Sequence, residues 1–115
     1  QVWEALMYPP KELLKNLVCI IDWNKGQNDG WSENFIPMYK NLEKRITSFG
    51  WDVQTIDGHS IDDIRKSFIK MRSDLPQCLI LDTMKGKGVS FMEDPSWHAK
   101  VPTEDQYQQA IKELQ

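Results

Sequence analysis

The sequence has few cysteines, no long apolar run and no surplus of positive charge, and each absence excludes a class of protein. Its two cysteines, Cys19 and Cys78, lie inside apolar runs, which is typical of small buried side chains rather than of a disulfide framework. No window approaches the roughly 18 apolar residues of a membrane span, and no signal-peptide pattern opens the chain. The net charge of −3 gives no electrostatic reason to expect nucleic acid or an anionic membrane as a partner. We therefore expect a cytoplasmic protein.

What is present is the composition of an ordinary globular segment, with 40% hydrophobic and 27% charged residues over 115 positions. That length allows one domain with a modest core. The chain begins QVWEAL, without an initiator methionine or a helix cap, and already reads as the middle of a helix. We interpret it as a piece of a longer polypeptide. Five tryptophans and five methionines favour a face that a partner covers.

Three short runs rich in β-forming residues predict strands at Leu17–Trp23, Asp52–Ile56 and Cys78–Thr83. The first and third are almost continuously apolar, which is typical of strands covered on both faces.

Amphipathic patterns predict helices after each of these strands. One helix is expected to run to Gly50, with apolar positions at Phe35, Met38, Leu42, Ile46 and Phe49. A second has Ser60 as N-cap, followed three residues later by Asp63, and apolar positions at Ile61, Ile64, Phe68 and Met71. A third begins at Thr103, with Gln106 completing a capping box, and is expected to bury Tyr107, Ala110, Ile111 and Leu114.

Strands that alternate with helices predict an α/β fold in which a parallel sheet carries helices on both faces. In such sheets ligands bind beyond the carboxyl ends of the strands. This places two loops at the functional edge: Asn24–Gly30 after the first strand and Lys85–Lys100 after the third. The latter is long for a compact domain, and loops of that length are often functional.

The first of these loops, NKGQNDG, combines asparagine side chains with glycine backbone. Amide and carbonyl oxygens are hard, neutral ligands that suit Mg²⁺ or Ca²⁺. Such an ion normally also takes one or two carboxylates, which this loop would need to receive from elsewhere. An Asx turn that binds no ion is the commoner meaning of such a sequence, so both readings stay open on spacing alone.

Four motifs occur in order along essentially the whole chain: QVWEALM, LVCIIDWNKGQNDG, FGWDVQTIDGHS and TMKGKGVSFMEDPSWHAKVPTEDQY. Together they resemble the later part of the thiamine diphosphate-binding domain of transketolase, and most of all the short N-terminal subunit of two-subunit transketolases. The resemblance implies the thiamine diphosphate-binding fold, with residues 1–115 as the C-terminal part of the diphosphate-binding domain. The Gly-Asp-Gly segment that precedes this part in the family is missing from the chain.

The resemblance also implies site residues. Asn24 and the carbonyl of Gly26 match ligands of Mg²⁺ (or Ca²⁺), and Asn28 matches a position beneath the cofactor. His98 matches a histidine that contacts the diphosphate and assists proton transfer on the sugar. Glu4 matches a glutamate in a carboxylate network between two active sites. Taken without the resemblance, Glu4 reads as a helix-surface charge and His98 as a packed loop histidine.

The implied function is that of one part of an enzyme that binds thiamine diphosphate and Mg²⁺ and moves a two-carbon ketol unit between sugar phosphates. Its implied partners are the upstream Gly-Asp-Gly segment and a pyrimidine-binding domain or subunit, in a homodimer or a heterotetramer. The chain alone should be inactive, since it lacks the carboxylate that anchors Mg²⁺. The donor and acceptor sugars are not specified by these residues.

The sequence departs from the family pattern at three places. Asn28 stands where an apolar residue is usual, Asp82 stands where a lysine is common, and Pro9-Pro10 is expected to break the opening helix. His59, in the turn Asp57-Gly58-His59, reads as a structural loop residue. These departures keep two alternatives open: a non-catalytic or degenerate domain that serves assembly, and another thiamine diphosphate enzyme such as a deoxyxylulose phosphate synthase.

Overall fold

The computed structural model describes residues 1–36, 40–71 and 74–115, and it divides into two compact units. The first unit comprises Gln1–Trp23 and Lys40–Thr83, and the second comprises Asn24–Tyr39 and Met84–Gln115. Among the described residues, no helix combines the length and the apolar character needed to cross a bilayer.

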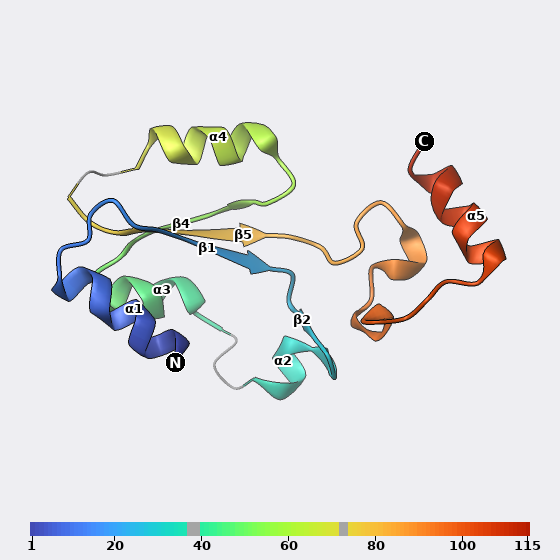
Figure 1. The fold of residues 1–115 in the computed structure, drawn as a ribbon, viewed down its shortest axis with the longest axis horizontal. Coiled ribbons are helices and arrows are strands. Elements are labelled where there is room, and N and C mark those ends of the chain that lie inside the picture. The colour runs from blue at the N-terminus through green and yellow to red at the C-terminus, as the bar shows by residue number, and fades with distance from the viewer. Residues whose placement is uncertain (37–39, 72–73) are drawn as a thin grey trace. The chain divides into compact units, whose positions relative to one another are not determined.

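The first unit is built on a three-stranded sheet in the order β1 (Val18–Trp23), β5 (Gln77–Asp82) and β4 (Asp52–Asp57). Both pairings are parallel. Helix α4 (Ile61–Ile69) covers one face, while α1 (Val2–Lys11) and α3 (Leu42–Ser48) cover the other (Figure 1). The structure thus confirms the expected α/β fold with a parallel sheet and helices on both faces.

The two near-continuous apolar strands differ in how well they are covered. The central strand β5 is buried from Gln77 to Ile80, as its sequence predicts. The prediction is wrong for β1, whose residues alternate between exposed and half-buried, with Ile20 55% exposed. The physical reason is position: β1 is an edge strand, and α4 packs against β4 at the opposite edge.

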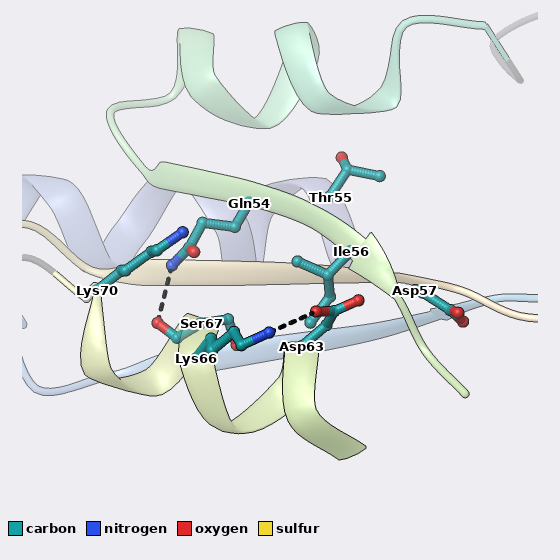
Figure 2. Close-up of a pocket in the computed structure, with 8 residues that line it drawn as sticks. All are labelled: Gln54, Thr55, Ile56, Asp57, Asp63, Lys66, Ser67 and Lys70. Atoms are coloured by element: carbon teal, nitrogen blue, oxygen red, sulfur yellow. Dashed lines mark hydrogen bonds and ion pairs between the residues drawn. The ribbon is translucent and has the colours of Figure 1, made fainter. Parts of the chain in front are cut away.

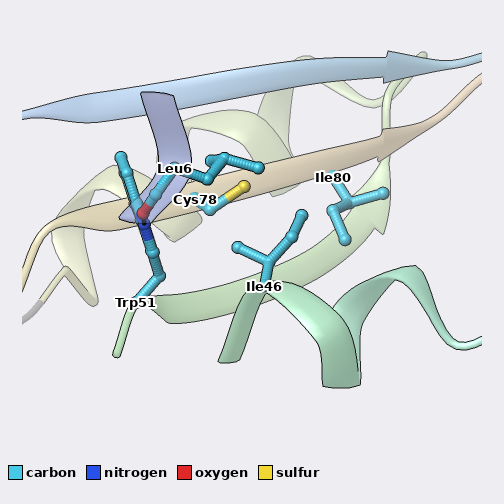
Figure 3. Packing of buried hydrophobic residues seen from close by; sticks show 5 residues of the cluster. All are labelled: Leu6, Ile46, Trp51, Cys78 and Ile80. Atoms are coloured by element: carbon cyan, nitrogen blue, oxygen red, sulfur yellow. Dashed lines mark hydrogen bonds between the residues drawn. The ribbon is translucent and has the colours of Figure 1, made fainter. Parts of the chain in front are cut away.

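The core of the first unit lies where α1 and α3 meet the sheet (Figure 3). Its buried members are Leu6, Ile46, Trp51, Cys78 and Ile80. Ile46 and Cys78 are completely inaccessible to solvent. These residues come from two helices, a strand and the segment before β4, so their burial joins parts that are far apart in the sequence.

The expectation that Pro9-Pro10 breaks the opening helix is wrong, because α1 continues through both prolines to Lys11. A proline ring is compatible with helical φ, but proline has no N–H to donate a hydrogen bond to the carbonyl four residues earlier. Pro10 therefore deprives the Leu6 carbonyl of its helical donor. The indole Nε1–H of Trp51 donates to this carbonyl at 2.7 Å and replaces the missing bond.

The predicted helix from Phe35 to Phe49 is also wrong in extent. Phe35 ends the short helix α2 (Ser32–Phe35), and Ile36 is extended. Met38 lies outside the described residues. Helix α3 begins only at Leu42, after Asn41 in a left-handed conformation with φ of 67°. Its predicted end is confirmed: the N–H of Gly50, at φ of 98°, donates to the carbonyl of Thr47 at 2.9 Å.

The predicted N-cap of α4 is confirmed, because the Ser60 hydroxyl accepts from the N–H of Asp63 at 3.2 Å. The apolar stripe of this helix is less buried than its pattern suggests. Ile61 and Phe68 are exposed, and the buried position is Ser67, whose hydroxyl donates to the Ile64 carbonyl at 2.6 Å.

The second unit holds short elements joined by turns. The hairpin strands β2 (Gly26–Gln27) and β3 (Gly30–Trp31) precede α2. The 3₁₀ turns η1 (Ser90–Met92) and η2 (Pro95–Trp97) precede α5 (Glu104–Glu113). The capping box of Thr103 and Gln106 is confirmed. The predicted burial along α5 is not: Ala110 is buried, whereas Tyr107, Ile111 and Leu114 are exposed.

Candidate functional site

Six residues of the second unit line a pocket of about 260 Å³: Asn24, Gly26, Gln27, Asn28, Lys85 and His98. The first four directly follow β1 in the chain, and Lys85 follows β5 by a few residues. The lining therefore comes from the two loops that follow β1 and β5 in the chain.

The loop after β1 turns on Asn24. Its side-chain Oδ1 accepts from the N–H of Gly26 at 2.9 Å, which forms an Asx turn. Lys25, between them, has a left-handed φ of 62°. The Asx turn that the sequence left open as a ligand-free alternative is thus present, and it fixes where the amide oxygen lies.

The hairpin register decides where the Gly26 carbonyl points. The N–H of Ser32 donates to the Lys25 carbonyl at 2.7 Å, so the facing residues Gly26 and Trp31 form a pair that exchanges no hydrogen bond. The N–H and C=O of such a residue point away from the partner strand. Because the N–H of Gly26 meets Asn24 Oδ1, the Gly26 carbonyl lies on the same side of the hairpin as the Asn24 side chain.

Glycine at position 26 permits a close approach. A Cβ there would lie 3.3 Å from Asn24 Oδ1 and 3.4 Å from Cγ of Pro95. A side chain would therefore press on the Asx turn and on η2. Its absence leaves the backbone of residue 26 open on the side of the pocket.

His98 is presented by the turn η2. The Asp94 carboxylate caps this turn by accepting from the N–H of Ser96 at 2.8 Å, and hydrogen bonds from Ser96 lower the pKa of Asp94. The backbone N–H of His98 donates to the Pro95 carbonyl at 2.9 Å. His98 is then extended, and Ala99 turns the chain with φ of 58°. The imidazole is solvent-accessible at the pocket.

The aromatic ring beside His98 is held on two sides. Trp97 packs against Phe91 with ring centroids 5.0 Å apart, and the ammonium of Lys100 lies 5.6 Å from the Trp97 ring centroid. These contacts fix the segment that carries the histidine, so the backbone of residues 97–98 is tied to the preceding loop.

Sequence reasoning missed two lining residues, Gln27 and Lys85. Lys85 is half-buried and contributes the positive charge in the pocket lining. Its signal was available, since TMKGKG places a lysine beside glycine just after a strand, where a backbone turn can present a cation to an anion. That turn needs glycine: Gly86 has φ of 70°, and a Cβ there would lie 2.2 Å from the Met92 carbonyl oxygen.

The pocket brings together Asn24, Gly26, Asn28 and His98 of the sequence-predicted set, but Glu4 is not among its lining residues. Glu4 is an exposed residue on α1 of the first unit. His59 also belongs to the first unit, where its N–H donates to Asp57 Oδ1 at 2.8 Å in the turn after β4.

The chemistry of the lining fits a phosphate-bearing ligand better than a bare cation. An amide oxygen and a peptide carbonyl can ligate Mg²⁺, while an ammonium and an imidazole can donate to phosphate oxygens. No carboxylate lines the pocket, and no group of three or more His, Cys, Asp or Glu side chains suited to a metal occurs among residues 1–36, 40–71 and 74–115. The residues present therefore fit the diphosphate and the neutral part of a magnesium shell.

A second hollow, of about 290 Å³, lies between β4 and α4 in the first unit (Figure 2). Some of its polar groups bond to one another. Lys66 pairs with Asp63 at 3.7 Å, and the Gln54 amide donates to the Ser67 carbonyl at 3.2 Å. These bonds join the helix to itself and to the edge strand, which is a structural role.

Comparison with known proteins gives consistent relatives, although no family model matches the chain. It is 40% identical over 116 residues to a subunit of apulose-4-phosphate transketolase from Phocaeicola vulgatus, covering 98% of this chain and 41% of that protein. It is 37% identical over 118 residues to the 6-deoxy-6-sulfo-D-fructose transketolase subunit SqwG of a Clostridium species, covering 42% of that protein. It is 35% identical to human transketolase over 118 residues, which cover 98% of this chain and 18% of the human protein.

Solved structures show the same fold. A transketolase from Pichia stipitis superposes with a TM-score of 0.85 at 23% identity, over 96% of this chain and 17% of that one. Transketolase from Campylobacter jejuni gives a TM-score of 0.84 over 97% of this chain and 18% of that one, also at 23% identity. The chain thus spans about two fifths of the bacterial subunits it matches and under a fifth of the longer transketolases. Sequence and fold together show that the chain is homologous to a segment of transketolases.

Proposed function

We propose that this chain is the part of a transketolase-like enzyme that binds the diphosphate of thiamine diphosphate with its Mg²⁺, in an enzyme that transfers a two-carbon ketol unit between sugar phosphates. The observation that carries the proposal is the pocket, because Asn24, Gly26, Asn28 and His98 line it together with Lys85. Residues 1–115 would be the C-terminal part of the diphosphate-binding domain.

Five of the six lining residues then have a role that their chemistry suits. Asn24 Oδ1 and the Gly26 carbonyl, on the same side of the hairpin, would ligate the metal. Lys85 would donate to diphosphate oxygens, and Asn28 would lie beside the cofactor. His98 would bind a phosphate oxygen or move a proton at a sugar hydroxyl, since an imidazole can both donate and accept a proton. When bound, thiamine diphosphate supplies the electron sink that carbon–carbon bond cleavage beside a carbonyl requires.

The remaining parts of the site would come from outside the chain. Mg²⁺ is usually held by one or two carboxylates in addition to phosphate, and the pocket lining has none. We propose that a Gly-Asp-Gly segment supplies the carboxylate and that a pyrimidine-binding domain or subunit completes the site. Two relatives are named as subunits, which supports a multi-subunit assembly. We propose that this assembly is a homodimer or heterotetramer in which Glu4 joins a carboxylate network between sites. We also propose a cytoplasmic location.

Calorimetry on the complete assembly tests the proposal. We expect Mg²⁺-dependent binding of thiamine diphosphate, and we expect Asn24→Ala to weaken it by about tenfold or more, which corresponds to ~1.4 kcal/mol. Asn24→Asp keeps an oxygen that can accept from the Gly26 N–H and should retain metal-dependent binding. Asn34→Ala is the matched control, because Asn34 lies on α2 and does not line the pocket. Absence of binding heat in the unmodified assembly would contradict the proposal.

A further inference from the structure

The two cysteines of the chain face each other across neighbouring strands of the first unit. In the parallel pairing of β1 with β5, Cys19 is the direct register partner of Cys78. Side chains at paired positions of neighbouring strands project from the same face of a sheet. Both cysteines are free, with Cys78 buried and Cys19 half-buried, and together with burial the neighbouring Cys19 contributes to the raised pKa of Cys78. The proposed function uses neither thiol.

We propose that Cys19 and Cys78 form a dithiol site that takes trivalent arsenicals. In the reaction, an arsenoxide R–As=O condenses with the two thiols to give R–As(S–Cys)₂ and water. Two S–H bonds and the As=O bond break, two As–S bonds form, and both protons leave on the oxygen. No oxidant or reductant is consumed, so the site needs only the ligand itself.

The spacing of the strands favours a bridging atom over a direct disulfide. In-register side chains on neighbouring parallel strands project alongside one another, so their Cβ atoms lie about as far apart as the strands, which is about 4.8 Å. The Cβ atoms of a disulfide lie only about 3.8 Å apart, so closing an S–S bond would require the strands to move together. An arsenic atom between the sulfurs spans the wider gap without that movement.

The surroundings of the pair favour the same class of ligand. Burial, with the neighbouring Cys19, raises the pKa of the Cys78 thiol to about 12, so this thiol is protonated at neutral pH, and the condensation carries its proton away on the arsenoxide oxygen. Among the described residues, no third histidine, cysteine or carboxylate joins the pair as a metal site. A ligand that is satisfied by two sulfurs is therefore preferred to zinc, which takes four ligands. Cys78 is itself completely inaccessible to solvent, so access to the pair is through the half-buried Cys19 on the edge strand β1.

Incubation of the full-length protein with phenylarsine oxide, followed by intact-mass and peptide mapping, tests the site. We expect one phenylarsenic group that links the peptides containing Cys19 and Cys78. The adduct should survive an excess of a monothiol such as glutathione and be removed by 2,3-dimercaptopropanol, because a chelate is displaced only by another dithiol. Cys19→Ser should abolish the stable adduct at this site.

A matched control keeps two cysteines but separates them. In the double variant Val18→Cys with Cys19→Ser, the relocated thiol projects from the opposite face of β1 and faces Gln77 instead of Cys78. This variant avoids any change to the buried Cys78, and circular dichroism shows whether it is folded. A folded control that binds the arsenical as stably as the unmodified protein would overturn the proposal. So would an unmodified protein whose adduct glutathione removes.

Discussion

The two units of the molecule are stabilised in different ways. The first unit has a contiguous apolar core, with Ile46, Trp51, Cys78 and Ile80 almost completely buried beneath α1 and α3. Among its described residues, the second unit buries few large apolar side chains, Val89 being one. It depends instead on caps and turns, such as Asp94 with Ser96 and Thr103 with Gln106.

The proposed chemistry lies in the second unit. All six residues of the pocket belong to it, and their backbone positions are set by an Asx turn, a 3₁₀ turn and a glycine turn. Loops that carry function are held by local hydrogen bonds because they have too little apolar surface to form a core of their own. Substitutions in the first unit should therefore act on global stability, and those in the second on local order and on the proposed activity.

Removing the Trp51 side chain should have the largest effect. Trp51 is 3% exposed and also donates to the Leu6 carbonyl, so Trp51→Ala should lower the free energy of unfolding by about 3–5 kcal/mol. Trp51→Phe should cost about 1–3 kcal/mol, because it keeps an aromatic ring but leaves the carbonyl without its donor. Urea unfolding of the full-length protein measures both. Trp3→Ala is the control, since Trp3 is 36% exposed; an equal loss there would contradict the special role of Trp51.

The next largest effect is expected on activity rather than on stability. If His98 moves a proton in the complete enzyme, His98→Ala should lower turnover by about 10²-fold or more, while the affinity for thiamine diphosphate changes less. Steady-state kinetics and calorimetry separate the two. His59→Ala is matched in chemistry and lies in a turn of the first unit. Unchanged turnover in His98→Ala would make His98 a structural loop residue.

Two glycines of one loop give a smaller and more local contrast. Gly86 and Gly88 both have positive φ, but a Cβ on Gly86 would meet the Met92 carbonyl oxygen at 2.2 Å, whereas one on Gly88 would meet the end of the Leu114 side chain at 3.1 Å. Each alanine costs about 1–2 kcal/mol for its left-handed backbone, and Gly86→Ala adds a clash that only backbone movement relieves. Hydrogen exchange at Val89 and Met92 should accelerate more in Gly86→Ala. Equal exchange in the two variants would refute the clash.

Much of the sheet and several local signals could be predicted from the sequence. The three strands, the cap at Ser60, the capping box at Thr103 and the end of α3 at Gly50 are local patterns, and the structure confirms them. The predictions for the burial of β1 and for the extent of α1 were wrong, because both features depend on parts of the chain that are distant in the sequence. Nothing near Pro10 in the sequence announces that Trp51 will satisfy the Leu6 carbonyl.

In the site, too, some residues could be predicted from the sequence and others could not. Asn24, Gly26, Asn28 and His98 came from motif resemblance, and the structure places them around one pocket with Lys85. Lys85 was missed because a lysine in a loop is ordinary, and only the turn at Gly86 gives it a fixed place. The roles assigned to these residues stay predictions, since a pocket's lining alone does not reveal what it binds.

The smallest expected effect concerns acid conditions and sharpens the contrast between the units. Glu113 of α5 accepts from the backbone N–H of Ser90 at 2.5 Å and from the Ser90 hydroxyl at 2.9 Å. Hydrogen bonds from the Ser90 backbone, the Gln109 side chain and the Ser90 hydroxyl lower the pKa of Glu113. A lowered pKa in the folded state means that this stabilisation is complete above the ordinary pKa of a glutamate and is lost as the pH falls through the folded value.

Exchange of the Ser90 amide hydrogen, followed by NMR against pH, measures this loss. The measured exchange should be corrected for the intrinsic pH dependence of an unprotected amide, and the remaining protection should fall on acidification. Glu113→Gln keeps an acceptor oxygen but has no titrating charge, so its protection should be weaker and independent of pH over the same range. Glu104→Gln, at the other end of α5, is the control and should behave as the unmodified protein. If acid removed as much protection at Ser90 in Glu113→Gln as in the unmodified protein, a group other than Glu113 would be responsible for the loss. The apolar core of the first unit has no titrating charge, so its packing should not respond to the same change in pH.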